Sequence, residues 1–142
     1  MWTIKPFEEL TTKELFDIYY LRTAVFVVEQ ECYYQEVDEA DLKSFHVCLT
    51  KDSELVAYCR LIPDQESIHL GRVVVPKAHR KDGYGRDLVQ TALDYCKEHF
   101  PNLPVHAQAQ SYLQNFYASF GFEPISDVYL EDGIPHLDMI KK

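Results

Sequence analysis

The sequence predicts an α/β domain built on one mixed β-sheet. Three observations lead to this fold class: short β-branched or alternating segments occur along the whole chain, amphipathic helical segments separate them, and glycine- or proline-containing turns join them. The expected order of elements is β-α-β-β-β-α-β-α-β-β. A chain of 142 residues, of which 46% are hydrophobic, can bury a substantial core. We therefore expect one domain spanning residues 1–142.

The first elements are a short strand and a helix. Residues 2–7 form a strand candidate, and Thr11 and Glu14 have the spacing of a capping box, which opens a helix. One face of this helix carries apolar side chains together with Arg22 and ends at Glu29. Arg22 is either a charge at the rim of the core or a buried partner of an acid such as Glu29.

A hairpin and a further strand follow an aromatic and acidic loop, residues 30–42. Strands are expected over residues 44–50 and 55–62, joined by a polar, hairpin-like connection. The next strand ends in three valines, residues 73–75, which is a buried-strand pattern that Pro76 stops.

A basic loop with two glycines connects this strand to a long amphipathic helix. The loop contains Gly83 and Gly85, and the helix begins at about Tyr84 and carries apolar residues at helical spacing up to Phe100. A strand, a glycine loop and a helix start leave unpaired backbone N–H groups at the positive end of a helix dipole. Such a site binds an anion, and a pyrophosphate suits it best. The loop has neither the Gly-Lys-Ser/Thr ending of a P-loop nor the GxGxxG of a dinucleotide site.

The last third of the chain adds a strand, a short helix and a hairpin. Residues 105–110 alternate apolar and polar side chains, as in a half-buried strand. Ser111 can cap a short helix over residues 112–119. Two strands, residues 124–130 and 135–140, form a last hairpin around an Asp-Gly turn.

Composition and charge exclude several classes of protein. The formal net charge of −9 argues against a nucleic-acid partner, because binding phosphates requires a basic face. No apolar run approaches the ~20 residues of a membrane span, and the first residues do not resemble a signal peptide. The four cysteines show no CxxC spacing, so we expect reduced thiols in a cytoplasmic protein. The six histidines lack the spacing of metal ligands, so no metal is expected.

Basic and acidic residues are unevenly distributed along the chain. Between residues 72 and 86 lie five basic residues, whereas residues 23–42 contain six acids and no Lys or Arg. A basic spot suits a polyanionic cofactor and an acidic stretch suits a cationic co-substrate, with ordinary solvated surface as the alternative.

Two separated motifs carry a resemblance to a known family. Residues 80–85 read Arg-Lys-Asp-Gly-Tyr-Gly, and in residues 115–122 Tyr117 precedes a Gly-Phe pair. These motifs resemble the R/Q-x-x-G-x-G/A signature and the Tyr-x-x-x-Gly-Phe ending of the GNAT acyl-CoA-dependent N-acyltransferases, although Gln110 stands where Asn is usual. The whole chain resembles the ElaA group of that superfamily, and the stretches that carry this likeness are residues 24–30, 34–38, 71–73 and 129–136.

The resemblance implies a fold and a cofactor. The GNAT fold is a single twisted, mixed and mostly antiparallel sheet of about six to seven strands flanked by about four helices. Coenzyme A, supplied as acetyl-CoA, would place its pyrophosphate on the glycine loop and its pantetheine arm along the valine strand. The residues expected to bind it are Val73, Val74, Val75, Arg80, Lys81, Asp82, Gly83, Tyr84, Gly85, Arg86, Gln110 and Tyr117.

Amine acylation requires deprotonation of the amine, polarisation of the thioester carbonyl and protonation of the leaving thiolate. An alkylammonium with a pKa near about 10.4 needs a base at neutral pH. The resemblance implies a backbone oxyanion donor near Val73 and Tyr117 as general acid; the alternative for Tyr117 is a core aromatic. The general base stays open between His69, Glu29, His136 and a water relay.

We therefore expect an acyltransferase that moves an acetyl group from acetyl-CoA to a primary amine by direct attack. One alternative is a non-catalytic acyl-CoA-binding sensor. Another is an enzyme similar to acyl-homoserine-lactone synthases, which would need an acidic acyl-carrier protein as partner of this acidic chain. The expected partner is a small-molecule or peptide amine, and a homodimer is compatible with the sequence.

Overall fold

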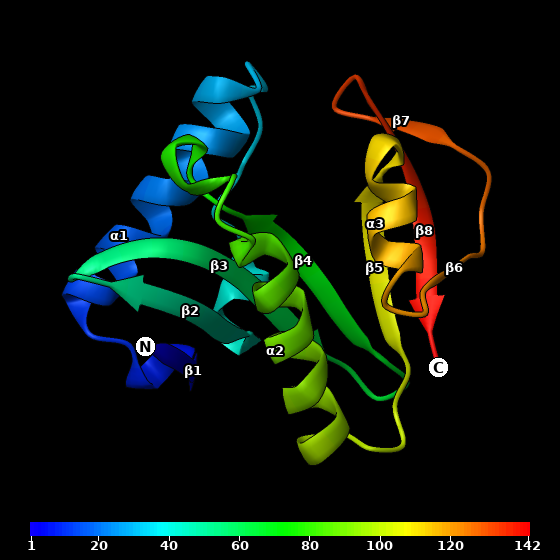
Figure 1. The fold of residues 1–142 in the computed structure, drawn as a ribbon, viewed down its shortest axis with the longest axis horizontal. Coiled ribbons are helices and arrows are strands. Elements are labelled where there is room, and N and C mark those ends of the chain that lie inside the picture. Colours follow the sequence, from blue (N-terminus) through cyan, green and yellow to red (C-terminus); the bar gives the residue numbers. More distant parts are fainter.

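The computed structural model describes all 142 residues and contains one eight-stranded sheet (Figure 1). The strand order is β1-β2-β3-β4-β5-β8-β6, with β7 paired to β8. Neighbouring strands are antiparallel except for β4 and β5, which are parallel. The strands are β1 (Trp2–Pro6), β2 (Phe45–Lys51), β3 (Glu54–Pro63), β4 (Ile68–Val74), β5 (Val105–Gln110), β6 (Glu123–Pro124), β7 (Tyr129–Glu131) and β8 (Ile134–Lys141). The expected mixed, mostly antiparallel sheet is confirmed, with one or two strands more than expected.

Three α-helices and several shorter helical turns flank the sheet. The α-helices are α1 (Thr12–Arg22), α2 (Tyr84–His99) and α3 (Gln114–Ala118), one fewer than expected. The chain continues from α1 into a π-helical segment, η2 (Thr23–Glu29), and forms 3-10 turns at η1 (Phe7–Glu9), η3 (Glu39–Lys43), η4 (Lys77–His79) and η5 (Ser111–Leu113). No helix combines the length and the apolar character needed to cross a membrane.

The two faces of the sheet bury different clusters. A core of 21 buried residues joins strands β2–β5 and β8 to α2 and α3, which lie in front of the sheet in Figure 1. A smaller cluster of 6 buried residues joins α1 and η2 to the opposite face, and it includes Ile18 and Leu21 of α1 and Tyr58 and Val74 of the sheet. Burying both faces of the central strands requires the apolar runs that the sequence shows there.

The start of α1 is capped as predicted. The Thr11 hydroxyl accepts a hydrogen bond from the Glu14 amide at 3.1 Å, and the Glu14 carboxylate accepts one from the Thr11 amide at 2.9 Å. Arg22 at the end of α1 is fully buried, as one of the two alternatives predicted. Its partners are Glu36 and Asp41 rather than Glu29, which lies one helical segment further along the chain.

Two expectations for the last third of the chain are wrong. Ser111 does not cap a helix, because the chain first makes the 3-10 turn η5, and α3 is shorter than expected. The strand expected over residues 124–130 is replaced by the short β6 and β7. Pro124 has no N–H to continue the ladder, and the intervening loop is held instead by Ser126, whose hydroxyl accepts from the Asp138 amide at 2.9 Å.

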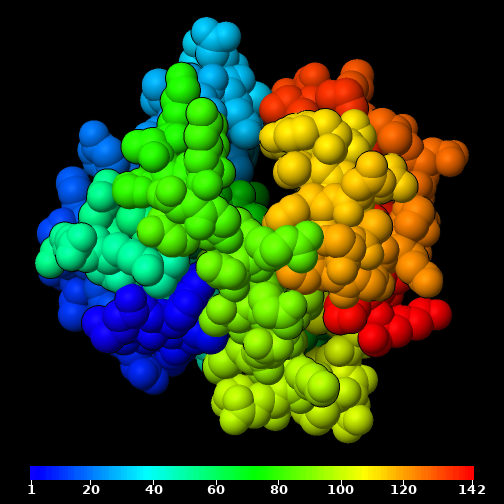
Figure 2. Space-filling view, in the orientation of Figure 1, coloured from blue at the N-terminus to red at the C-terminus, as the bar shows by residue number.

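Strands β4 and β5 pair over a short stretch and then separate. Pairing joins Ile68, His69 and Leu70 of β4 to residues 105–107 of β5, and β4 has no strand partner on its β5 side beyond Leu70. On its other side β4 carries a bulge, because Gly71 pairs with Arg60 whereas Val74 pairs with Tyr58. Arg72, in this bulge, has a φ of 50°. Figure 2 shows a hollow between the segment that follows β4 and the segment around α3.

Candidate functional site

A cleft of about 840 Å³ lies where β4 and β5 separate. It is lined by residues of β4, β5, β8, η2, the loop after η2, η5 and α3. The alternation of strand residues places Val105, Ala107 and Ala109 of β5 in the core, so the polar residues between them face the cleft. These cleft residues are His106, Gln108 and Gln110.

The edge of β4 that faces this cleft has free backbone groups. Residues 71–75 line the cleft and have no strand partner on the β5 side, and of the groups in this segment the Val75 carbonyl, just after β4, accepts from the Arg80 side chain. An open strand edge presents N–H and C=O groups that can pair with an extended ligand. The three valines therefore offer the cleft an amide-lined wall as well as apolar side chains.

The glycine loop ends with free amides at the start of α2. Gly83 precedes the helix with a φ of 78°, a conformation that glycine adopts at little cost. The amides of Gly83, Tyr84, Gly85 and Arg86 donate to no loop carbonyl or side chain, and the first amides of a helix have no partner within it. Together with the dipole of this 16-residue helix, they provide an electropositive terminus.

Arg80 connects this loop to the other side of the cleft. Its Nη1 and Nη2 atoms donate to the Glu29 carboxylate at 2.7 and 2.9 Å, and its Nε donates to the Val75 carbonyl at 3.0 Å. The hydrogen bonds from Arg80 lower the pKa of Glu29. Two residues that were expected to act separately, one on cofactor and one as base, are thus joined in an ion pair at the cleft.

Three other charged or aromatic side chains of the loop, those of Asp82, Tyr84 and Arg86, have partners outside the cleft. Arg86 donates to the Ser119 hydroxyl at 2.6 Å and lies over the Phe120 ring at 4.6 Å, so it fixes α2 to the segment after α3. Tyr84 lies beneath the Lys51 ammonium, and Asp82 lies 3.5 Å from His79. Lys81 has no side-chain partner. Any contact of Tyr84 and Arg86 with a ligand at the helix start would therefore use the backbone.

Tyr117 lies both in an aromatic cluster of the core and at the wall of the cleft. It is buried on α3 and packs edge-on against Phe116 and Phe122, with ring centroids 5.3 and 5.7 Å away. It also lines the cleft, and its hydroxyl makes no hydrogen bond within the protein. Burial raises the pKa of Tyr117 above its ordinary value, so the phenol is neutral and keeps its proton at physiological pH.

The two candidate histidine bases lie on the cleft face of the sheet. The Nε2 atom of His69 lies 2.8 Å from the Asp64 carboxylate, and its ring is 5.3 Å from that of His106. The Nδ1 atom of His136 lies 2.7 Å from the Ile134 carbonyl. Both histidines line the cleft, whereas no group of three metal-binding side chains is found in the structure.

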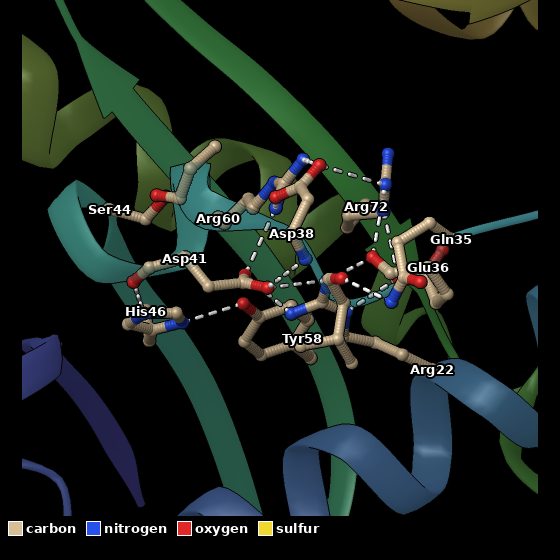
Figure 3. Close-up of polar contacts among 12 residues, drawn as sticks. Arg22, Gln35, Glu36, Asp38, Asp41, Ser44, His46, Tyr58, Arg60 and Arg72 are labelled. Atoms are coloured by element: carbon tan, nitrogen blue, oxygen red, sulfur yellow. Dashed lines mark hydrogen bonds and ion pairs between the residues drawn. The ribbon is translucent and has the colours of Figure 1, made fainter.

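Sequence reasoning missed a buried ionic network beside the cleft (Figure 3). Arg22 donates to Glu36 and Asp41 at 2.7 Å each, and Arg60 donates to Asp38 at 2.7 Å and to Asp41 at 3.0 Å. Arg72, projecting from the β4 bulge, donates to Glu36 at 2.8 Å. Three arginines and three acids thus anchor the loop after η2 against β3 and β4.

The charges of this network stabilise one another. Burial alone would raise the pKa of Asp41, but hydrogen bonds and charge from Arg22 and Arg60 lower it. Burial of Arg22 disfavours its charged form, yet its bonds to Asp41 raise its pKa overall. A signal was present in the sequence, since three arginines occupy otherwise apolar segments and the acids at 36 and 38 have no Lys or Arg within four residues in the chain.

A second polar chain closes the far wall of the cleft. Gln108 donates to the Tyr129 hydroxyl at 2.9 Å, and Tyr129 donates to Asp138 at 2.6 Å. Neither Tyr129 nor Asp138 was singled out from the sequence as a site residue. Gln108 and Asp138 lie opposite each other in the register of β5 and β8, and both side chains bond to the Tyr129 hydroxyl.

Comparison with known proteins places these features in a family. Residues 8–142 match the family model described as the acetyltransferase (GNAT) domain. The chain is 52% identical over 138 residues to a UPF0039 protein of Schizosaccharomyces pombe, an alignment that covers 95% of this chain and 92% of that protein. It is 44% identical over 146 residues to protein ElaA of Escherichia coli, covering 99% and 95%. The crystal structure of an acyl-CoA N-acyltransferase from Pseudomonas aeruginosa has a TM-score of 0.96 at 41% identity, covering 100% of this chain and 99% of that one.

Proposed function

The chain belongs to the GNAT acetyltransferase family, and we propose that it transfers an acetyl group from acetyl-CoA to a primary amine. The observation that carries the proposal is the open edge of β4, which leads from the cleft to the free amides at the start of α2. An extended pantetheine arm can pair with such an edge while a diphosphate binds the helix start.

In this proposal the cofactor contacts are mainly backbone contacts. The amides of residues 83–86 bind the diphosphate, and Val73, Val74 and Val75 pair with the pantetheine arm. Arg80 and Lys81 supply positive charge near the diphosphate, whereas Asp82 shapes the loop. Gln110 and Tyr117 line the opposite wall. Gln110 stands where the family usually has Asn, and its side-chain amide offers the cofactor the same donor and acceptor groups.

The reaction is a direct displacement on the thioester. The amine nitrogen attacks the carbonyl carbon, a C–N bond forms, and the C–S bond breaks. A backbone N–H near Val73 stabilises the developing oxyanion, because the β4 bulge leaves amides of this segment outside the sheet ladder. Tyr117 donates its phenolic proton to the departing thiolate and is reprotonated from solvent.

The geometry favours His69 as the general base. Arg80 holds Glu29 in the protein without cofactor and lowers its pKa, and a carboxylate released from such a pair, with an ordinary pKa of about 4.3, is still a weak base at neutral pH. His136 is bonded to a backbone carbonyl. Of the two histidines, only His69 has a ring that a carboxylate orients, and this carboxylate would also stabilise the imidazolium formed on proton uptake.

The acceptor is proposed to be a cationic primary amine. The cleft walls carry Glu131, Asp132 and Asp138 on the β7–β8 hairpin, and none of these three carboxylates is paired with a basic side chain. The four cysteines are free and buried, which supports action in a reducing, cytoplasmic compartment.

The test is thiol release from acetyl-CoA across polyamines, amino acids, aminoglycosides and peptide N-termini. We expect turnover with at least one amine. The Tyr117→Phe variant should lose about 100-fold or more in kcat with little change in CoA affinity, because it removes the phenolic proton and keeps the ring that lines the cleft. Tight CoA binding without turnover on any amine would instead indicate a sensor that binds the cofactor and performs no transfer.

A further inference from the structure

Two histidines face each other where the cleft begins. His69 and His106 are register partners on the parallel strands β4 and β5, one row before the last pair, Leu70 and Ala107. Their ring centroids are 5.3 Å apart with the planes tilted by 52°. Both side chains point away from the main core, because their strand neighbours on either side are buried in it, and both line the cleft.

Asp64 is fixed in the turn between β3 and β4 beside this pair. One carboxylate oxygen accepts hydrogen bonds from the amides of Glu66 and Ser67 at 2.7 and 2.8 Å. The other oxygen lies 2.8 Å from the Nε2 atom of His69. The two backbone hydrogen bonds lower the pKa of Asp64 to about 2, so the group is a carboxylate throughout the physiological range.

This contact fixes the tautomer of His69. A carboxylate can only accept a hydrogen bond, so the Nε2 atom facing it carries the proton. In the neutral ring the lone pair then lies on Nδ1, which has no hydrogen-bond partner within the protein. His69 also pairs with Ile62 on β3 and with His106 on β5, and its Nε2 atom lies 3.3 Å from the Ser67 hydroxyl. The guanidinium of Arg72, which lines the same cleft, is bonded to Glu36.

We propose that Asp64, His69 and His106 form the path by which the acceptor amine loses its proton, an inference that rests on the proposed function. An N–H bond of the ammonium breaks and the proton moves, directly or through one water, to Nδ1 of His69. Asp64 is a positioning residue that holds the ring and stabilises the imidazolium. His106 then takes the proton and releases it to solvent, which returns His69 to its neutral form.

One arm of the test needs no turnover. Side-chain ¹⁵N spectra of the resting wild-type protein should show His69 as a single neutral tautomer protonated at Nε2. Asp64→Ala should give a mixture of tautomers. Asp64→Asn should favour the tautomer protonated at Nδ1, because its one oxygen stays with the amides of Glu66 and Ser67 and its NH2 group then donates to Nε2 of His69. A tautomer mixture in the wild type, or no change in Asp64→Ala, would overturn the assignment of Asp64.

The second arm measures proton removal with the best amine found in the panel and with spermidine as a fixed probe. At pH 7 we expect kcat to fall about 100-fold in His69→Ala and about 10-fold in Asp64→Asn, since a general base contributes about 10²- to 10⁴-fold. The kcat of His106→Asn should also fall below that of the wild type. All three losses in kcat should shrink as the pH approaches about 10, where more of the amine binds already deprotonated. Glu66→Gln, a change of charge in the same turn, is the matched control.

The two arms separate the failure of this inference from the failure of the proposed function. Turnover at the wild-type rate in the His69→Ala variant, or a loss of kcat in Asp64→Asn that does not depend on pH, would contradict the proton path. Either result would leave the proposed acyl transfer intact. A protein that shows the predicted His69 tautomer but acylates no amine contradicts the proposed function, and with it the path.

Discussion

At the scale of single residues, the ion pair between Arg80 and Glu29 determines how the cleft receives an anion. Both side chains are more than a third exposed, at 39% and 38%, so the pair is readily exchanged for another partner. A diphosphate at the start of α2 would compete with the Glu29 carboxylate for the Arg80 guanidinium. Cofactor binding would thereby release Glu29, which lines the cleft, from its ion pair.

Replacing Glu29 by Gln should therefore tighten binding of CoA. The variant removes a competing negative charge, and we expect a two- to fivefold lower Kd at low salt, in keeping with the modest strength of exposed pairs. Isothermal titration calorimetry measures the change, with Glu31→Gln, an exposed acid nearby in sequence, as control. Weaker binding in Glu29→Gln would mean that Glu29 holds Arg80 in position for the cofactor instead.

At the scale of elements, the buried arginines tie the loop of residues 30–44 to the sheet. Arg22 comes from the end of α1, Arg60 from β3 and Arg72 from the bulge of β4, and all three bind acids of that loop (Figure 3). Removing one member leaves buried charge without a partner, which costs more than the pair contributes net.

Arg22→Met should consequently destabilise the protein by about 3–5 kcal/mol, because Glu36 and Asp41 lose a buried partner. Urea unfolding measures the loss, and Lys13→Met, which removes an exposed pair with Asp17 on the same helix, should change stability by less than about 1 kcal/mol. Equal effects of the two variants would contradict the assigned role of the network.

The same network predicts a dependence of stability on pH. The pKa values of Asp38 and Asp41 are lower in the folded protein than in the unfolded chain, because Arg60 and Arg22 oppose the effect of burial. Their contribution is therefore present above the unfolded value of about 3.9 and is lost as the pH falls through the lower folded values. Urea midpoints between about pH 5 and pH 2 should fall, and the fall should be smaller in Asp41→Asn. An equally steep fall in that variant would assign acid sensitivity elsewhere.

Local patterns predicted the elements more completely than they predicted the contacts between them. The capping box of α1, the limits of β5 and the start of α2 follow from neighbouring residues, so the sequence predicted them correctly. The partners of Arg22 lie 14 and 19 residues away, and Arg72 reaches Glu36 across 36 residues. Such pairings depend on strand register and on the β4 bulge, which no local pattern encodes.

At the scale of the whole molecule, the site exists because the sheet opens. Strands β1–β4 with α1 and α2 form one side, and β5–β8 with α3 form the other (Figure 1). They share three register pairs between β4 and β5. The sequence placed the glycine loop and Tyr117 in the right elements. The position of His69, His106 and Asp138 on one cleft, with Asp64 beside His69, follows only from the register of four strands.

A crystal structure of the protein with CoA would show whether the glycine loop and the open edge of β4 hold the cofactor. We predict that the diphosphate oxygens accept hydrogen bonds from the amides of Gly83, Tyr84 and Gly85, and that the pantetheine arm pairs with the open edge of β4 along Val73, Val74 and Val75. A complex in which CoA binds elsewhere, and these amides and this strand edge make no contact with it, would contradict the account.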